Sequence, residues 1–104
     1  MLRIYGVVLE VVRDVKPIVE AIERRDPDLA RQMRRAAASV ALNVSEGMYS
    51  QGRNRRARYH NAMGSMRETL ACIEVGEALG YVEGSAKLRA SIDHVVGTLY
   101  KLCA

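Results

Sequence analysis

The sequence predicts an all-α fold, an antiparallel up-down four-helix bundle that occupies residues 1–104 as a single domain. Apolar residues recur at spacings of three and four in four separate segments, which is the helical period. Short connections containing Pro or Gly separate these segments, so consecutive helices should lie antiparallel. The apolar residues are mainly Leu, Val, Ala and Met, with five Tyr and neither Trp nor Phe, a composition that suits helices better than strands.

The first helix is expected over residues 4–24. Its apolar positions are Ile4, Val7, Val8, Val11, Val12, Val15, Ile18, Val19 and Ile22. Pro17 lies inside this segment and should kink or divide the helix, because proline lacks the backbone N–H and clashes with the preceding turn. The valine-rich run would also tolerate a strand, but no partner strand is found elsewhere in the sequence.

The second helix is expected over residues 27–46. Asp26 can cap it, Pro27 suits the first helical position, and Asp28 favours the positive end of the helix dipole. Gly47 is expected to terminate it. Its apolar face comprises Leu29, Met33, Ala37, Val40, Ala41 and Val44, whereas Arg31, Arg34 and Arg35 fall mainly on the other side.

The third helix is expected over residues 54–79, after a loop, and Gly80 should end it. Its apolar positions are Tyr59, Met63, Met66, Leu70 and Ile73. Ser85 is expected to cap the fourth helix. That helix carries Leu88, Ile92, Val95, Val96, Leu99 and Leu102.

Several classes of protein are not expected. No apolar run reaches the roughly 18 residues of a membrane span, and charged residues interrupt the apolar N-terminus where a signal peptide would be continuous. A soluble, cytoplasmic protein without membrane contact is therefore expected. Cys72 and Cys103 form no metal-binding spacing, and no disulfide is expected. His60 and His94 stand in no HExxH or ExxH arrangement, so neither an enzyme, a metal site nor a cofactor is predicted.

Positive charge is concentrated in the middle of the chain. The net charge is +4, but residues 24–67 carry ten Arg against three acidic residues, a local charge of +7. Clustered positive charge suggests an anionic partner, nucleic acid first. On charge alone, a solvated face that keeps the protein soluble explains the pattern equally well.

The basic run QGRNRRARYHN is the best functional candidate. Guanidinium groups bind phosphates bidentately, and arginine and tyrosine also stack on exposed bases. The alternative is that Tyr59 belongs to the core and the arginines are merely solvated. The candidate RNA-binding residues are Arg31, Arg34, Arg35, Arg53, Arg55, Arg56 and Arg58.

Asn43 and Glu46 are unusual at the end of an apolar helix, because buried polar groups are costly when unpaired. Helix-end carbonyls, loop amides or a neighbouring arginine would satisfy them. We expect Glu46 to order the loop as a structural ion pair, and Glu68, one turn after Gly64 and Ser65, to do the same from the third helix. Structural roles are favoured over catalysis, since no acid–base partners are present.

The middle of the chain contains two linked motifs. The first comprises Gln32, Arg34, Arg35, Ala36, Ala37, Ser39, Asn43, Glu46 and Gly47. The second comprises Gly64, Ser65, Glu68, Leu79, Gly80 and Tyr81. Together they resemble the motifs of the 23S rRNA intervening-sequence protein family. The chain departs from the family pattern at Val40-Ala-Leu42, where an Ile- and Pro-containing segment is usual, and at the more polar start of the third helix.

The resemblance implies a left-handed antiparallel four-helix bundle that assembles into a homopentamer around a central channel. It also implies an association with structured RNA of the rRNA intervening-sequence type. A related branch, the accessory variability determinant proteins of diversity-generating retroelements, is similar in fold and works with a reverse transcriptase. Neither role implies an enzyme.

Three interpretations remain open from the sequence. The first is a non-catalytic RNA-binding bundle, in which Asn43 and Glu46 hold a turn that presents the arginines of residues 53–58, with copies repeated around a ring. The second is an adaptor whose basic surface receives a reverse transcriptase. The third is a structural oligomer without a nucleic-acid partner.

Overall fold

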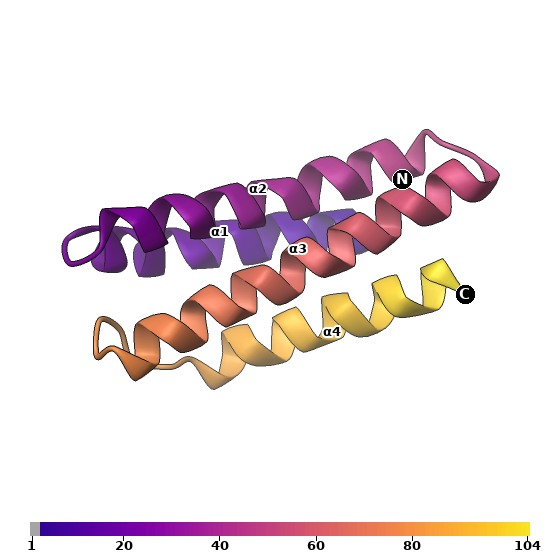
Figure 1. The fold of residues 1–104 in the computed structure, drawn as a ribbon. Coiled ribbons are helices and arrows are strands. Elements are labelled where there is room, and N and C mark those ends of the chain that lie inside the picture. The colour runs from indigo at the N-terminus through magenta and orange to yellow at the C-terminus, as the bar shows by residue number, and fades with distance from the viewer. Residues whose placement is uncertain (1–2) are drawn as a thin grey trace.

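The fold is a bundle of four antiparallel α-helices. The computed structural model describes residues 3–104, in which the helices are α1 (Arg3–Glu23), α2 (Pro27–Met48), α3 (Gly52–Ala78) and α4 (Ala86–Cys103). The largest contact joins α2 to α3, and α4 makes a smaller contact with α1 (Figure 1). The predicted all-α bundle is confirmed. Met1 and Leu2, which the predicted domain includes, lie outside the described residues.

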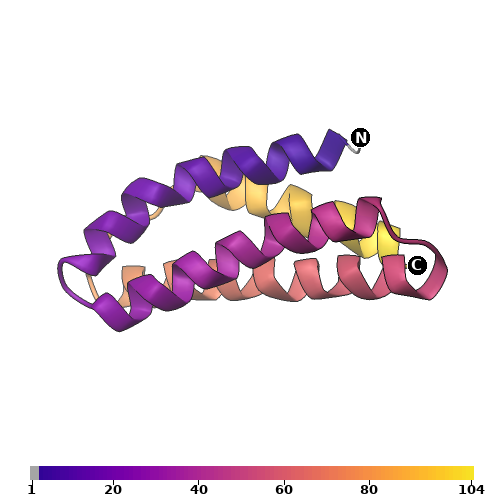
Figure 2. The same cartoon turned by 90° about the horizontal axis from the view of Figure 1, so that it is seen from above.

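The bundle is elongated and its two ends differ in construction. Its extents are 42 × 24 × 19 Å. The α1–α2 turn and the α3–α4 connection lie at one end, which we call the two-turn end (Figures 1 and 2). The α2–α3 turn, the start of α1 and the end of α4 lie at the other, which we call the one-turn end. Residues far apart in the sequence therefore meet at each end.

The core forms from one apolar stripe on each helix. In α1 the buried positions are Ile4, Val8, Val11, Val15, Val19 and Ile22, which follow the predicted period. Met33, Val40 and Val44 of α2 and Met66 of α3 are almost fully buried against them. Burial of such side chains contributes roughly 1.5–3 kcal/mol each and drives the association of the helices. Among residues 3–104, no helix is long and apolar enough to span a membrane.

The predicted helix boundaries are confirmed where they rest on local hydrogen bonds. The Asp26 carboxylate accepts a bond of 3.0 Å from the Leu29 N–H, and the Ser85 hydroxyl accepts one of 3.2 Å from the Leu88 N–H. Gly80 has φ +77° and ends α3. Its N–H donates to the Glu77 carbonyl while the Tyr81 N–H donates to the Gly76 carbonyl, which is the Schellman arrangement.

One boundary prediction is narrowed and another is wrong. Helix α1 runs through Pro17, so of the predicted kink or division the division does not occur. Pro17 and Arg13, whose carbonyl the ring would block, are both exposed, so water can satisfy that carbonyl. Gly47 does not terminate α2, which continues to Met48. Gly47 is instead buried where a Cβ atom would overlap the Tyr59 ring of α3, so glycine allows the two helices to approach closely.

Candidate nucleic-acid interface

The structure divides the predicted arginine-rich surface into two clusters. Residues 24–67 run the whole length of α2, whose 22 residues span roughly 33 Å. Arg31, Arg34 and Arg35 therefore lie in the half of α2 nearer the two-turn end. The arginines of residues 53–58 lie on the first turns of α3, at the one-turn end. A single continuous surface through both clusters is not formed within one chain.

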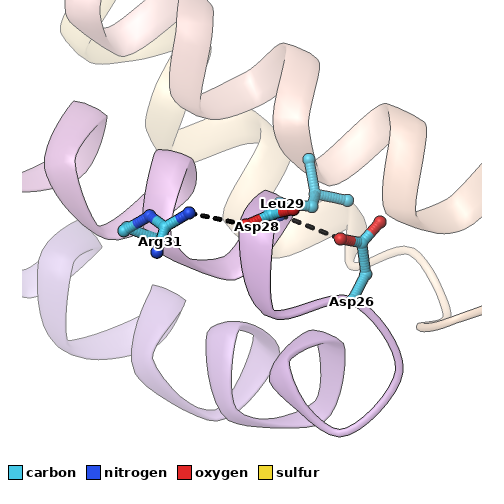
Figure 3. Close-up of polar contacts among 4 residues, drawn as sticks. All are labelled: Asp26, Asp28, Leu29 and Arg31. Atoms are coloured by element: carbon cyan, nitrogen blue, oxygen red, sulfur yellow. Dashed lines mark hydrogen bonds and ion pairs between the residues drawn. The ribbon is translucent and has the colours of Figure 1, made fainter.

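Arginines near the two-turn end are largely paired. Figure 3 shows Arg31 reaching back to Asp28 on the first turn of α2, beside the Asp26 cap. Arg34 donates to both carboxylate oxygens of Glu23, at 3.0 and 2.9 Å. These bonds and the positive charge of Arg34 lower the pKa of the Glu23 carboxyl. The same bonds and the negative charge of Glu23 raise the pKa of the Arg34 guanidinium.

Further pairs join α3 and α4 at the same end. Arg89 contacts Glu74 at 3.2 Å and Glu77 at 3.6 Å. The Arg25 guanidinium lies 5.6 Å from the centroid of the Tyr81 ring, a cation–π contact between the α1–α2 turn and the α3–α4 connection. Positive charge here is used to join elements of the bundle.

The balance of charge differs sharply between the ends. Residues 20–35 and 74–89, at the two-turn end, carry seven basic and seven acidic side chains, which cancel. Residues 3–8, 42–58 and 97–104, at the one-turn end, carry six basic side chains and one acidic side chain, a net charge of +5. The one-turn end therefore holds more than the net positive charge of the entire chain.

Arg55 differs from its neighbours because it holds the α2–α3 turn. Its Nε donates to the carbonyl of Ser50 at 2.8 Å and to that of Gly47 at 3.2 Å. These carbonyls belong to the last turn of α2 and the residues after it, which lack partners inside the helix. By contrast, the exposed side chains of Arg53, Arg56 and Arg58 have no ion pair or hydrogen bond within the described part of the chain.

The backbone of Glu46, not its carboxylate, organises the turn. The Glu46 carbonyl accepts from the Ser50 hydroxyl at 2.8 Å and from the Tyr49 N–H at 3.2 Å. The carboxylate is exposed and forms no ion pair with any residue in the range 3–104, so the predicted ion pair of Glu46 is wrong. Glu68 is likewise exposed and makes no ion pair with the described residues.

Asn43 belongs to a polar seam between α2 and α3. Its amide donates to the Ser39 carbonyl at 2.9 Å and to the Ser39 hydroxyl at 3.1 Å. The hydroxyls of Ser39 and Ser65 share a hydrogen bond of 2.8 Å, and buried Thr69 donates to the Ser65 carbonyl. Asn43 thus supports Ser39, whose hydroxyl bonds across to α3. The prediction that Asn43 holds the α2–α3 turn is wrong, because its side chain bonds Ser39 one helical turn earlier.

The seam opens into a polar groove of about 590 Å³ between α2 and α3. Residues from both motifs line it: Gln32, Arg35, Ser39, Ser65 and Glu68, together with Asp28 and Arg31. Gly64 is exposed, and a Cβ atom there would meet open space. The two motifs, separated in the sequence, therefore meet along one helix pair.

The sequence interpretation missed several residues of the one-turn end. Arg3 of α1 and Lys101 of α4 add their charges to the arginines of α3. Tyr49 and Tyr100 are strongly exposed there. The predicted topology could have indicated these residues. In an up-down bundle of four helices, the start of the first helix and the end of the fourth lie beside the turn between the second and third. Among residues 3–104, no group of His, Cys, Asp and Glu side chains is placed to hold a metal ion.

Comparison with known proteins agrees with the fold and with the motifs. The pattern of the family described as 23S rRNA-intervening sequence protein matches residues 1–101. A crystal structure of a protein of unknown function from the S23 ribosomal protein family of Bacteroides thetaiotaomicron superposes with a TM-score of 0.74, at 17% identity, over 96% of this chain and 94% of that chain. Among curated proteins, no significant match is found. Because the family pattern covers nearly the whole sequence, the chain belongs to the 23S rRNA-intervening sequence protein family.

Proposed function

We propose that this protein is a non-catalytic RNA-binding bundle that holds structured RNA at its one-turn end. The observation that carries the proposal is the group of exposed arginines at positions 53, 56 and 58, which have no acidic partner among the described residues. Unpaired guanidinium groups contact phosphates without first giving up an internal ion pair. The family's name associates its members with rRNA, which supports an RNA partner.

Assembly would strengthen such binding. The homopentamer implied by the sequence resemblance would repeat the one-turn end around a ring, and linked weak contacts raise the overall affinity without any new contact. The arginines of one chain would then need to bind RNA only weakly. The alternative site for RNA is the polar groove between α2 and α3, since Arg31 and Arg35 line it.

The test compares two triple variants that remove equal charge. R53Q/R56Q/R58Q neutralises the one-turn end and leaves Arg55, which holds the turn. R31Q/R34Q/R35Q neutralises the other cluster and serves as the matched control. Affinity for a labelled RNA stem–loop is measured at several salt concentrations, with helix content and oligomer mass checked for each protein.

We expect the one-turn variant to lose at least tenfold in affinity. Its slope of log affinity against log salt should fall by about two to three, because each phosphate contact contributes about 0.7–0.9 to that slope. The control variant should stay near the wild type. Equal losses in both variants, or a loss only in the control, would overturn the assignment to the one-turn end, and the latter would favour the groove.

The remaining interpretations are outcomes of the same experiment. If the wild type shows no salt-dependent binding, RNA binding itself fails. A reverse transcriptase that copurifies with the protein and is released by R53Q/R56Q/R58Q would then identify an adaptor. An oligomer that binds neither partner would be structural.

A further inference from the structure

Given RNA binding at the one-turn end, we propose that Tyr49 is a stacking platform for an unpaired base. Loops, bulges or single strands would then be recognised at the α2–α3 turn, and the arginines would contact the phosphates of duplex RNA. The inference rests on the proposed function but is separable from it, because stacking and phosphate contacts respond to different substitutions.

The side chain of Tyr49 has no structural use in the described chain. It is 86% exposed, the highest value among the large apolar side chains of residues 3–104. Only its backbone N–H serves the turn, by donating to the carbonyl of Glu46 at the end of α2. A polar residue would provide the same N–H. A single exposed aromatic residue is ordinary on a protein surface, so its surroundings must decide what it means.

The surroundings are rigid and strongly basic. Arg55 bonds the carbonyls of Gly47 and Ser50, on either side of Tyr49, and so ties the turn to the first turns of α3. The same turns of α3 carry the unpaired Arg53 and Arg56. The Ser50 hydroxyl closes the turn onto the Glu46 carbonyl. A turn fixed in this way presents the ring with little loss of freedom on binding.

The tyrosine at the other end shows the contrast. Tyr81 is half-buried, and the Arg25 guanidinium already lies over its ring. No cation–π contact occupies Tyr49 within residues 3–104. An exposed ring beside free arginines offers the two contacts that unpaired nucleotides use, a face for the base and cations for the phosphates. Stacked duplex bases cannot reach such a ring.

The experiment uses two RNAs and three variants of the full chain. One RNA is a hairpin with a loop of unpaired nucleotides, and the other is a blunt duplex with the same number of phosphates. The variants are Y49L, Y49F and L79A, the last removing an exposed apolar side chain at the two-turn end. Melting temperature is measured for all three, and Y49L should leave it unchanged.

The wild type should prefer the hairpin. Y49L should weaken hairpin binding roughly 5- to 150-fold, the range for loss of one stacked base, and leave duplex binding unchanged. Y49F should keep the preference, because it retains the ring, and L79A should resemble the wild type. Hairpin affinity that Y49L leaves unchanged would overturn the inference even if the arginine variants still lose RNA. Wild-type protein that binds neither RNA would remove the proposed function together with the inference.

Discussion

The two ends of the bundle contain similar side chains and use them differently. At the two-turn end, arginines pair with carboxylates across helices, as in the bidentate contact of Arg34 with Glu23, and Arg25 covers Tyr81. Among the four arginines of residues 53–58 at the one-turn end, only the side chain of Arg55 forms hydrogen bonds with described residues. Arg53, Arg56 and Arg58 extend into solvent, and Tyr49 is exposed beside them.

This difference teaches that the number of arginines is a poor guide to a binding surface. What distinguishes the ends is the supply of carboxylates, seven at one end and one at the other. Exposed ion pairs contribute little to stability. At the two-turn end their main effect is therefore that positive and negative charges cancel. At the one-turn end the positive charge is not cancelled, so its electrostatic field attracts polyanions.

The largest expected effect on stability comes from a methyl group at a close helix contact. Gly47→Ala should lower the free energy of unfolding by about 2 kcal/mol, since the Tyr59 ring must move and overpacking costs about 1–3 kcal/mol. The measurement is denaturant unfolding followed by circular dichroism. The matched variant at the other end is Gly76→Ala.

At Gly76 an added Cβ atom would meet the terminal Cδ1 of Ile22 at 2.9 Å, which a flexible side chain can relieve by rotating. Alanine also favours a helix over glycine by up to about 1 kcal/mol. Gly76→Ala should therefore be close to neutral. Equal costs at both glycines would show that the two ends are packed alike.

A smaller effect on stability is expected for the arginine that holds the α2–α3 turn, Arg55, and none for its neighbour Arg56. Arg55→Met should lower the free energy of unfolding by about 1 kcal/mol, because the Ser50 carbonyl loses the Arg55 donor and the Gly47 carbonyl keeps only the Ser50 N–H, at a partly exposed site. Arg56→Met, one residue later, should leave unfolding unchanged and weaken RNA binding. Thermal unfolding and RNA titration of the same two proteins check both statements, and a stable Arg55→Met protein would contradict the role given to Arg55.

The smallest effect is a dependence on pH at the two-turn end. Arg34 lowers the pKa of the Glu23 carboxyl in the folded protein, so the pair stabilises the fold above the usual pKa of a glutamate. That contribution is lost as the pH falls through the lowered pKa. Glu23→Gln should slightly reduce the melting temperature at neutral pH, and the difference from the wild type should vanish in acid.

Glu46→Gln at the one-turn end is the control for this pH series. Its carboxylate has no ion pair within residues 3–104 and lies near the negative end of the α2 dipole. Removing the charge should therefore not destabilise the protein at any pH. A destabilised Glu46→Gln protein would show that the two ends do not differ in the use of their carboxylates.

The sequence by itself determined the features whose partners lie within a few residues. The caps of Asp26 and Ser85 bond N–H groups three residues away, and Gly80 ends α3 through bonds confined to one turn. The apolar period of each helix likewise follows from its own residues. The four helices and the bundle class were therefore predictable, and the two family motifs could be found by inspection.

Only the tertiary structure decided how the polar residues are used. Gly47 is needed because Tyr59 packs on it from the next helix, and Ser39 meets Ser65 across 26 positions of the sequence. The basic segment is continuous in the sequence, but most of the length of α2 separates its two arginine clusters, which lie toward opposite ends of the bundle. Charges act through space, so which arginines are paired and which are free depends on what the packed helices bring beside them.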